Sequence, residues 1–391
     1  MNPSLEAEPA LDPLAAPLKA CRRPAAELVQ RADRVARSCG VAAGDAARRA
    51  AARILEHAGD PVAAAAALLG AARSRGDAPA SVETLRREFG PVVAGLAEAD
   101  PSRFRLESPG DGERRARFEE LLAAFAERPR LALLRLAFRL VELEDALYGR
   151  RHDGEALARE TLALWVPIAD RLSLGGLRRR LEDLSFRLLD PAGYEALREK
   201  IAPIQEGDER YLAALRRHVQ ELLESNGIRA EIQTRTKSLH AIRRKMLRTG
   251  KNPEEIMDRL GVRIIVETVP ECYQVLGLIH TAFTPVPGTF DDYIGRPKDN
   301  GYQSLHTVVI PVRELSHKPV EFQIRTRRMH LVAEFGPAAH WLYKNEEAPA
   351  EEDPAARRRL GALLDEERHA ESLEAFLERL ARRVPEGGDR P

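Results

Sequence analysis

The chain has 391 residues, more than one ordinary hydrophobic core accommodates, so we expect two domains with room for a small third element. Hydrophobic residues make up 44% of the chain and aromatic residues only 5%, a composition that favours helices over a β-sandwich. The 61 Lys and Arg residues balance the 61 Asp and Glu residues, which excludes a polycation that coats nucleic acid, so any basic site must be local.

The three cysteines, Cys21, Cys39 and Cys272, form no CxxC pair and have no histidine at zinc-site spacing, so we expect neither a disulfide nor a zinc site. The N-terminus carries acids and prolines where a signal peptide needs a basic start and an apolar core. The sequence contains no run of about 18 apolar residues. We therefore expect a soluble, cytoplasmic protein with no membrane partner.

The first half of the chain is predicted to be helical. Residues 1–22 are rich in Pro and Ala and are expected to be disordered. Over residues 23–200, apolar residues recur at spacings of three and four, which is typical of an all-α domain with a following linker. Ser81 is expected to cap one of these helices and Gly90 to end it.

The pattern changes after a helix that Asn226 and Gly227 are expected to end. Helices are predicted at 238–250, 252–261 and 271–283, and strands at 228–235, 261–268, 302–312 and 318–326. Interleaved helices and strands predict an α+β domain over residues 201–345, with a mixed β-sheet flanked by helices. Residues 346–391 are charged and are predicted to form a helical tail.

The last predicted strand alternates in character. Glu321, Gln323 and Arg325 lie on the face opposite to Phe322. A polar strand face of this kind is usually a solvent-facing surface, and the alternative is that it lines a site.

A basic stripe follows the first predicted strand. Arg235 ends that strand, and Lys237, Ala241, Lys245 and Arg248 recur after it at helical spacing. Such a stripe is usually a solvated helix face. Here it begins at a strand-to-helix turn, where backbone N–H groups and the helix dipole favour anions, so backbone and side chains together could hold a polyphosphate.

Asp258 follows near the end of the short predicted helix 252–261. A carboxylate there could bind Mg²⁺ beside a nucleotide, because Mg²⁺ prefers one or two carboxylates together with phosphate oxygens. The alternative is a surface salt bridge.

Five segments in order carry a resemblance to a known family: RTKSLHAIRRKM, DRLGVRIIV, ECYQVLGLIH, FDDYIGRPKDNGYQSLHTVV and EFQIRTRRMHLVAEFGPAAHWLYK. They resemble the synthetase domain of the RelA/SpoT homologue family, continuously from Glu231 to Lys344. A weaker resemblance upstream is to the family's linker between its hydrolase and synthetase domains. The resemblance implies a nucleotidyltransferase-like fold and transfer of pyrophosphate from ATP to the 3′-hydroxyl of GTP or GDP, with Mg²⁺, giving ppGpp or pppGpp.

The resemblance also implies roles for individual residues on the ATP side. Arg235 and Arg263 are expected to stack on the adenine, as planar guanidinium groups can. Lys237 and Lys245 are expected to bind the phosphates.

The metal and the acceptor nucleotide have their own implied residues. Asp258 and Glu321 are expected to hold Mg²⁺, and Glu321 is also the candidate general base. Residues around the guanine nucleotide are expected to be Lys298, Asn300, Tyr302, His306 and Gln323, with the Tyr302 ring stacked on the base. Together with Arg235 and Lys237, the two carboxylates form the predicted catalytic set.

Two positions depart from or refine the family pattern. Ala241 stands where serine is common, and the lost hydrogen bond, worth ~1 kcal/mol, is expected to lower affinity or rate. Asp291 stands where bifunctional members carry lysine, which resembles the synthesis-only branch of the family.

The upstream domain resembles the family's HD hydrolase without its metal ligands. Gly70 and Ala71 stand at the HD pair, Ser74 and Arg75 at an acidic pair, and Phe138 at a later Asp. Because Gly, Ala and Phe supply no ligand for a hard or borderline metal, we expect no hydrolase metal site and no hydrolase activity. The domain is then expected to be a structural or regulatory scaffold.

The resemblance also implies which partners this chain has. Longer family members continue into ribosome-sensing regions, whereas this chain stops at Pro391, so we expect no ribosome control by that route. ATP and GTP or GDP are the expected substrates, with (p)ppGpp as an allosteric ligand to be tested. Two alternatives stay open: the same fold acting on an adenine nucleotide or a tRNA 3′ end, and a non-catalytic nucleotide sensor.

Overall fold

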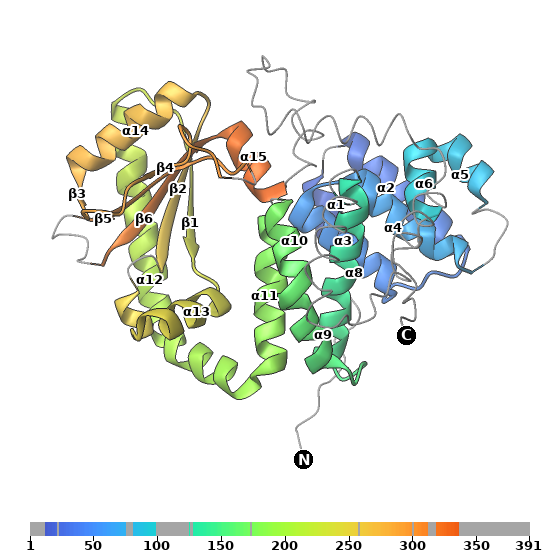
Figure 1. Cartoon of the computed structure of the whole chain (residues 1–391). Coiled ribbons are helices and arrows are strands. Elements are labelled where there is room, and N and C mark those ends of the chain that lie inside the picture. The colour runs from blue at the N-terminus through green and yellow to red at the C-terminus, as the bar shows by residue number, and fades with distance from the viewer. Residues whose placement is uncertain are drawn as a thin grey trace, which may run out of the picture. The chain divides into compact units, whose positions relative to one another are not determined.

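The computed structural model describes residues 12–21, 23–75, 81–98, 125, 128–172, 174–256, 259–298, 301–311 and 318–335 (Figure 1). Among these, the residues up to Glu142 form one compact unit and those from Leu143 onward form another. The boundary predicted near residue 200 falls inside α12 (Pro191–Ser225), one continuous helix of the second unit, and stays a prediction. No helix in the described ranges is long and apolar enough to cross a membrane.

The first unit is all-α, as predicted. Its helices are α1 (Ala15–Ala20), α2 (Arg23–Ser38), α3 (Ala46–Ala58), α4 (Pro61–Arg73), α5 (Val82–Phe89), α6 (Pro91–Glu98) and the first part of α8 (Pro129–Leu147). The side chain of Ser81 accepts a hydrogen bond from the Thr84 N–H and Gly90 follows the last residue of α5, which confirms both predicted ends. α1 lies inside the segment 1–22 that was predicted to be disordered, so that prediction is wrong for this helix.

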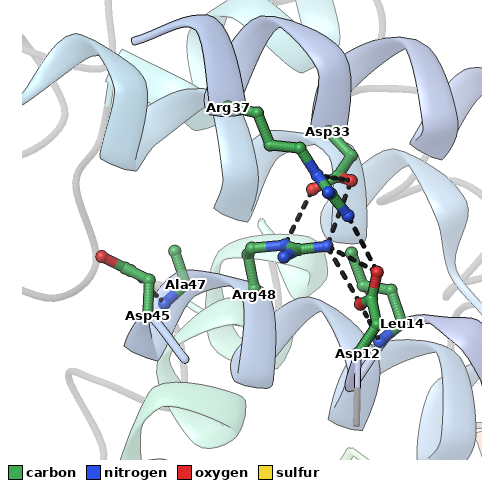
Figure 2. Close-up of polar contacts among 7 residues, drawn as sticks. All are labelled: Asp12, Leu14, Asp33, Arg37, Asp45, Ala47 and Arg48. Atoms are coloured by element: carbon green, nitrogen blue, oxygen red, sulfur yellow. Dashed lines mark hydrogen bonds and ion pairs between the residues drawn. The ribbon is translucent and has the colours of Figure 1, made fainter. Parts of the chain in front are cut away.

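Charged side chains fasten the N-terminal segment to α2 and α3 (Figure 2). Arg48 of α3 is only 1% exposed, and its Nη2 lies 3.0 Å from Asp12 Oδ1 and 3.2 Å from Asp33 Oδ2. Arg37 also donates to both carboxylates, each at 2.8 Å. Two guanidinium groups thus neutralise two carboxylates, which offsets part of the desolvation cost of burying Arg48.

The second unit opens with helices. They are α9 (Gly154–Glu160), a π-helix at Thr161–Trp165, α10 (Val166–Arg171), α11 (Gly175–Leu189) and α12. α13 (Leu239–Thr249), α14 (Val269–Ala282) and α15 (Arg327–Phe335) follow later in the chain. The helix predicted at 252–261 is instead a 3₁₀ turn at Pro253–Glu255, which begins with a capping box between Asn252 and Glu255.

The second unit also contains a six-stranded mixed sheet. Its strands are β1 (Glu231–Thr236), β2 (Leu260–Val266), β3 (Thr284–Pro285), β4 (Asp291–Asp292), β5 (Leu305–Ile310) and β6 (Val320–Thr326). The order is β1-β2-β6-β5-β3, with β4 also paired to β5. β2 and β6 are parallel and the other pairs are antiparallel. The four predicted strands and the mixed sheet are confirmed.

One face of this sheet is the main core of the second unit. Val262, Phe322 and Ile324 on that face pack with apolar residues of α12 and α14. The Phe322 ring stacks on Phe283 with centroids 5.9 Å apart. A smaller separate core joins the first half of α12 to α13, where Leu197 and Ile201 meet Phe186, Ile242 and Ile256.

Candidate active site

The site lies on the other face of the sheet, where strand register brings polar residues together. Arg235 of β1 is paired with Gly261 of β2, and Gly261 with Glu321 of β6. Directly paired residues project to the same side of a sheet, so the three positions share one face. A Cβ at Gly261 would lie 3.1 Å from Arg235 Cγ, so the glycine leaves the space in which Arg235 crosses β2 to reach Glu321.

Glu321 is the centre of this face. Its Oε2 accepts hydrogen bonds from Arg235 Nη2 at 3.0 Å and from Gln323 Nε2 at 2.8 Å, and its Oε1 lies 3.5 Å from His306 Nδ1. Burial raises the pKa of Glu321, but the hydrogen bond and charge of His306, with those of Arg235, outweigh burial and lower this pKa to about 2. Glu321 is therefore a carboxylate at neutral pH and a weak proton acceptor in this arrangement.

The second row of the same face contains buried polar side chains. In register, Arg263 of β2 pairs with Gln233 of β1 and Gln323 of β6, and Gln323 pairs with His306 of β5. Arg263 Nη1 donates to Gln233 Oε1 at 3.2 Å. Gln323 is 3% exposed, and its Oε1 has no hydrogen-bond partner among the described residues. A buried acceptor without a partner marks a place for a donor from a ligand or water.

Aromatic rings and a cation gather beside His306. The Tyr302 hydroxyl lies 2.8 Å from His306 Nε2. Lys298 Nζ lies 5.3 Å from the centroid of the Tyr302 ring and 4.2 Å from that of Tyr293. Tyr293 also meets His306 edge to face, with centroids 5.3 Å apart. Tyr293 was not among the predicted site residues, and its position in FDDYIG, just ahead of the segment from Lys298 to His306, was the signal that could have indicated it.

A tight turn places Lys298 over these rings. Gly301 has a φ of 72°, and its N–H donates to Lys298 O at 2.7 Å. The Lys298 N–H donates to Tyr302 O at 3.2 Å. A residue with a side chain rarely adopts this φ, so the glycine is required by the turn.

The basic stripe of α13 starts next to this face, but its N-terminus is already occupied. Asp183 Oδ1 accepts the His240 N–H at 3.0 Å, and Ser238 Oγ accepts the Ala241 N–H at 3.3 Å. Two of the backbone N–H groups at the start of α13 are thus taken by a carboxylate of α11 and by the Ser238 cap. Binding of a polyphosphate by other backbone N–H groups of this turn and by the side chain of Lys237 stays a prediction.

Lys237 and Lys245 lie at the start and in the middle of this basic segment. The Lys237 N–H donates to Arg259 O at 3.0 Å, which holds the lysine next to the start of β2. Two predicted site residues, Asp258 and Asn300, lie outside the described residues, so their predicted roles stay predictions.

For the cation, the structure can test Glu321 alone. Its ionised oxygen ligands are of the hard type that Mg²⁺ prefers, so the residue fits a magnesium ligand. Within the described ranges, no cluster of three or more His, Cys, Asp or Glu residues could hold a metal by itself. Glu321 would therefore need a further ligand from outside these ranges or from a bound phosphate.

The first unit has a cavity of about 220 Å³ between α3, α4 and α8. Its lining includes every position at which a hydrolase ligand was predicted to be missing: Gly70, Ala71, Ser74, Arg75 and Phe138. Arg75 Nη2 pairs with Asp45 Oδ2 at 2.7 Å. A Cβ at Gly70 would lie 3.2 Å from the Ala97 carbonyl oxygen, so the backbone of α6 crowds any larger residue there.

Comparison with known proteins finds two family matches, the first of which extends past the unit boundary at Glu142. Residues 24–175 match the family described as HD domain, and residues 234–348 match the region found in RelA/SpoT proteins. Residues 234–348 are a RelA/SpoT region. This region contains Arg235, Arg263, His306, Glu321 and Gln323 of the polar sheet face, and the segment matched to the HD domain contains the cavity.

Curated relatives carry two different names. A guanosine-3′,5′-bis(diphosphate) 3′-pyrophosphohydrolase of Aquifex aeolicus is 41% identical over 276 residues, 70% of this chain and 39% of the relative. A GTP pyrophosphokinase of Streptomyces coelicolor is 39% identical over 274 residues, 69% of this chain and 31% of the relative. The chain thus spans well under half the length of these relatives.

Among solved structures, small alarmone synthetase 2 of Bacillus subtilis matches with a TM-score of 0.30 and 24% identity, over 46% of this chain and 98% of that chain. Small alarmone synthetase 1 of the same organism, bound to its product pppGpp, matches with a TM-score of 0.30 and 21% identity, over 49% of this chain and 98% of that chain.

Proposed function

We propose that this protein is a GTP pyrophosphokinase, which transfers the pyrophosphoryl group of ATP to the 3′-hydroxyl of GTP or GDP. The observation that carries the proposal is the ionised Glu321 at the centre of the polar sheet face, with Arg235, Gln323 and His306 around it. The RelA/SpoT region and the names of the relatives support the same activity.

The reaction asks for positioning and for neutralisation of charge. The 3′-oxygen of the acceptor attacks the β-phosphorus of ATP, the bond from that phosphorus to the oxygen bridging to the α-phosphorus breaks, and AMP leaves with the electron pair. The hydroxyl proton passes to a base, for which we propose Glu321. Phosphoryl transfer needs little covalent chemistry from a protein, so orientation by side chains on a rigid sheet suits it.

The basicity of Glu321 depends on His306 and on Arg235. With both groups in place, the carboxylate accepts a proton poorly, because its pKa is about 2. We propose that Arg235 leaves Glu321 to stack on the adenine, which raises the pKa of the carboxylate as ATP binds. Lys237 and Lys245 then meet the phosphates as point charges.

Mg²⁺ would be held by Glu321 together with Asp258, and would neutralise phosphate charge when bound. Tyr302 is the stacking surface for the guanine, with Lys298 and His306 beside its ring. Gln323 Oε1 is proposed to accept a hydrogen bond from the acceptor nucleotide.

We also propose that the HD domain has lost hydrolysis. At the positions where its ligands would lie, the cavity is lined by Gly70, Ala71 and Phe138, none of which binds a metal, and the carboxylate of Asp45 in the lining is paired with Arg75. One relative is named a hydrolase, so the loss is proposed for this chain and not for the family.

The proposal is tested by incubating the protein with ATP, Mg²⁺ and either GDP or GTP and separating the nucleotides. AMP and ppGpp or pppGpp should form, and Glu321→Gln should abolish both. Parallel reactions with ATP or tRNA as the acceptor decide whether guanine is required. Nucleotide binding without AMP formation would show a sensor instead, and release of pyrophosphate from added ppGpp with Mn²⁺ would show that hydrolysis persists.

A further inference from the structure

A buried carboxylate of α12 holds two cations that the proposed mechanism does not use. Asp208 is fully buried, and its oxygens accept hydrogen bonds from both Nη atoms of Arg259 and from Lys318 Nζ, the last at 2.9 Å. Arg259 is itself buried, whereas the Lys318 side chain is 45% exposed. A carboxylate buried in this way depends on its cationic partners, so the three groups form one unit.

The two cations lie at the starts of neighbouring parallel strands. Arg259 immediately precedes β2, and Lys318 lies two residues before β6. One turn after Asp208, the Tyr211 hydroxyl donates to Lys318 O at 3.2 Å. A single turn of α12 therefore fixes the starts of both strands.

The same strand starts carry the centre of the candidate site. The Arg259 carbonyl accepts the Lys237 N–H at 3.0 Å, so the backbone of the phosphate-binding lysine is attached to a residue that Asp208 holds. Glu321 is the second residue of β6, three residues after Lys318. Arg259 is thus hydrogen-bonded to one residue of the proposed mechanism, Lys237, and Lys318 lies three residues before another, Glu321.

We propose that Asp208 is a positioning residue of the synthetase site, which sets the placement of Lys237 through Arg259 and of Glu321 through Lys318. The inference rests on the proposed function, because it takes Lys237 as a phosphate ligand. Two roles of Asp208 predict different results. A carboxylate that only stabilises the fold affects the melting temperature, whereas a positioning carboxylate also affects how tightly the phosphates are bound.

The test compares binding of a non-hydrolysable ATP analogue with binding of adenosine, by calorimetry on the full chain. The dissociation constant of adenosine divided by that of the ATP analogue measures the affinity gained from the phosphates. Asp208→Asn keeps the shape of the side chain and should reduce this ratio roughly tenfold, in the range seen when a group that orients a ligand-binding residue is removed. Glu221→Gln, the same change at an exposed position of α12, should leave the ratio unchanged.

A double-mutant cycle makes the result specific to Lys237. Lys237→Met should reduce the same ratio, and Asp208→Asn added to it should change the ratio little further, because both act through one lysine. Losses that multiply would overturn the inference, as would a lower melting temperature with an unchanged ratio.

A second variant covers failure of Asp208→Asn to fold. Lys318→Met removes only the half-exposed partner, and should lower kcat for AMP formation while leaving the phosphate-dependent ratio near that of the wild type. A wild-type kcat in Lys318→Met would overturn the Glu321 part of the inference. If the wild-type protein binds the analogue but forms no AMP with any acceptor, the proposed function fails, and the cycle at Lys237 still decides the role of Asp208.

Discussion

Replacing Glu321 by Gln should remove a pH dependence from the stability of the second unit. The pKa of this carboxyl falls from an ordinary 4.5 to about 2 in the folded protein. A depressed carboxyl pKa stabilises the folded state above pH 4.5, and this stabilisation is lost as the pH falls towards 2. The full difference corresponds to about 3 kcal/mol of unfolding free energy at 1.36 kcal/mol per pKa unit.

The part of this difference that can be measured lies between pH 3 and pH 5.5. Over that range the wild type should gain about 2 kcal/mol relative to Glu321→Gln, because Gln does not ionise. Urea unfolding followed by tryptophan fluorescence reports the second unit through Trp165, which is buried in that unit.

Two further measurements decide how the result is interpreted. Glu221→Gln, which removes an exposed carboxyl of α12, is the matched control. The pH dependence of its unfolding free energy should match that of the wild type. If the difference between the wild type and Glu321→Gln stays constant from pH 3 to pH 5.5, the contacts of Glu321 with His306 and Arg235 do not hold the carboxylate as described. Loss of AMP formation alone would not rescue that reasoning.

Three other substitutions test separate parts of the structure. Arg48→Met removes the buried guanidinium that Asp12 and Asp33 share, and should lower the free energy of unfolding of the first unit by about 3 kcal/mol, measured in urea by circular dichroism; a change near zero would show that the network in Figure 2 is not stabilising. Tyr302→Ala should raise the KM for GDP roughly tenfold through lost stacking, whereas Tyr302→Phe should change it little; equal effects would exclude the ring as the stacking surface. Gly70→Ala should destabilise the first unit by about 1 kcal/mol, because the added methyl group meets the Ala97 carbonyl, while AMP formation continues at its normal rate. Improved thermal stability of that variant would contradict the crowding.

Local patterns were sufficient for the elements that have strong local causes. The alternation in 318–326 predicted β6 and its two faces, and both are present, with Phe322 in the core and Glu321 on the site face. Capping residues such as Ser81 predicted helix ends because a cap acts within three residues of the backbone it satisfies. To predict which polar residues pair across the strands, only the register between these strands would have been needed in addition.

Contacts between residues that lie far apart in the chain could not be predicted from the sequence. Asp183 lies more than fifty residues before the helix end that it caps, and no local pattern links it to His240. β3 and β4 have two residues each, too few for alternation to be recognised. The unit boundary at Glu142 lies within α8, where helical periodicity continues without a break.

The length of α12 has a mechanical consequence. Its first half belongs to the small core with α13, and its second half, from Tyr211 onward, belongs to the core under the sheet. At 35 residues it is a rod of about 50 Å that runs from the core shared with α13 to the core under the sheet. Pro203 lies between the two halves and removes one backbone hydrogen bond there, so this turn is a place where the helix can kink. A kink at Pro203 would change the direction of the segment packed against α13 relative to the segment packed under the sheet.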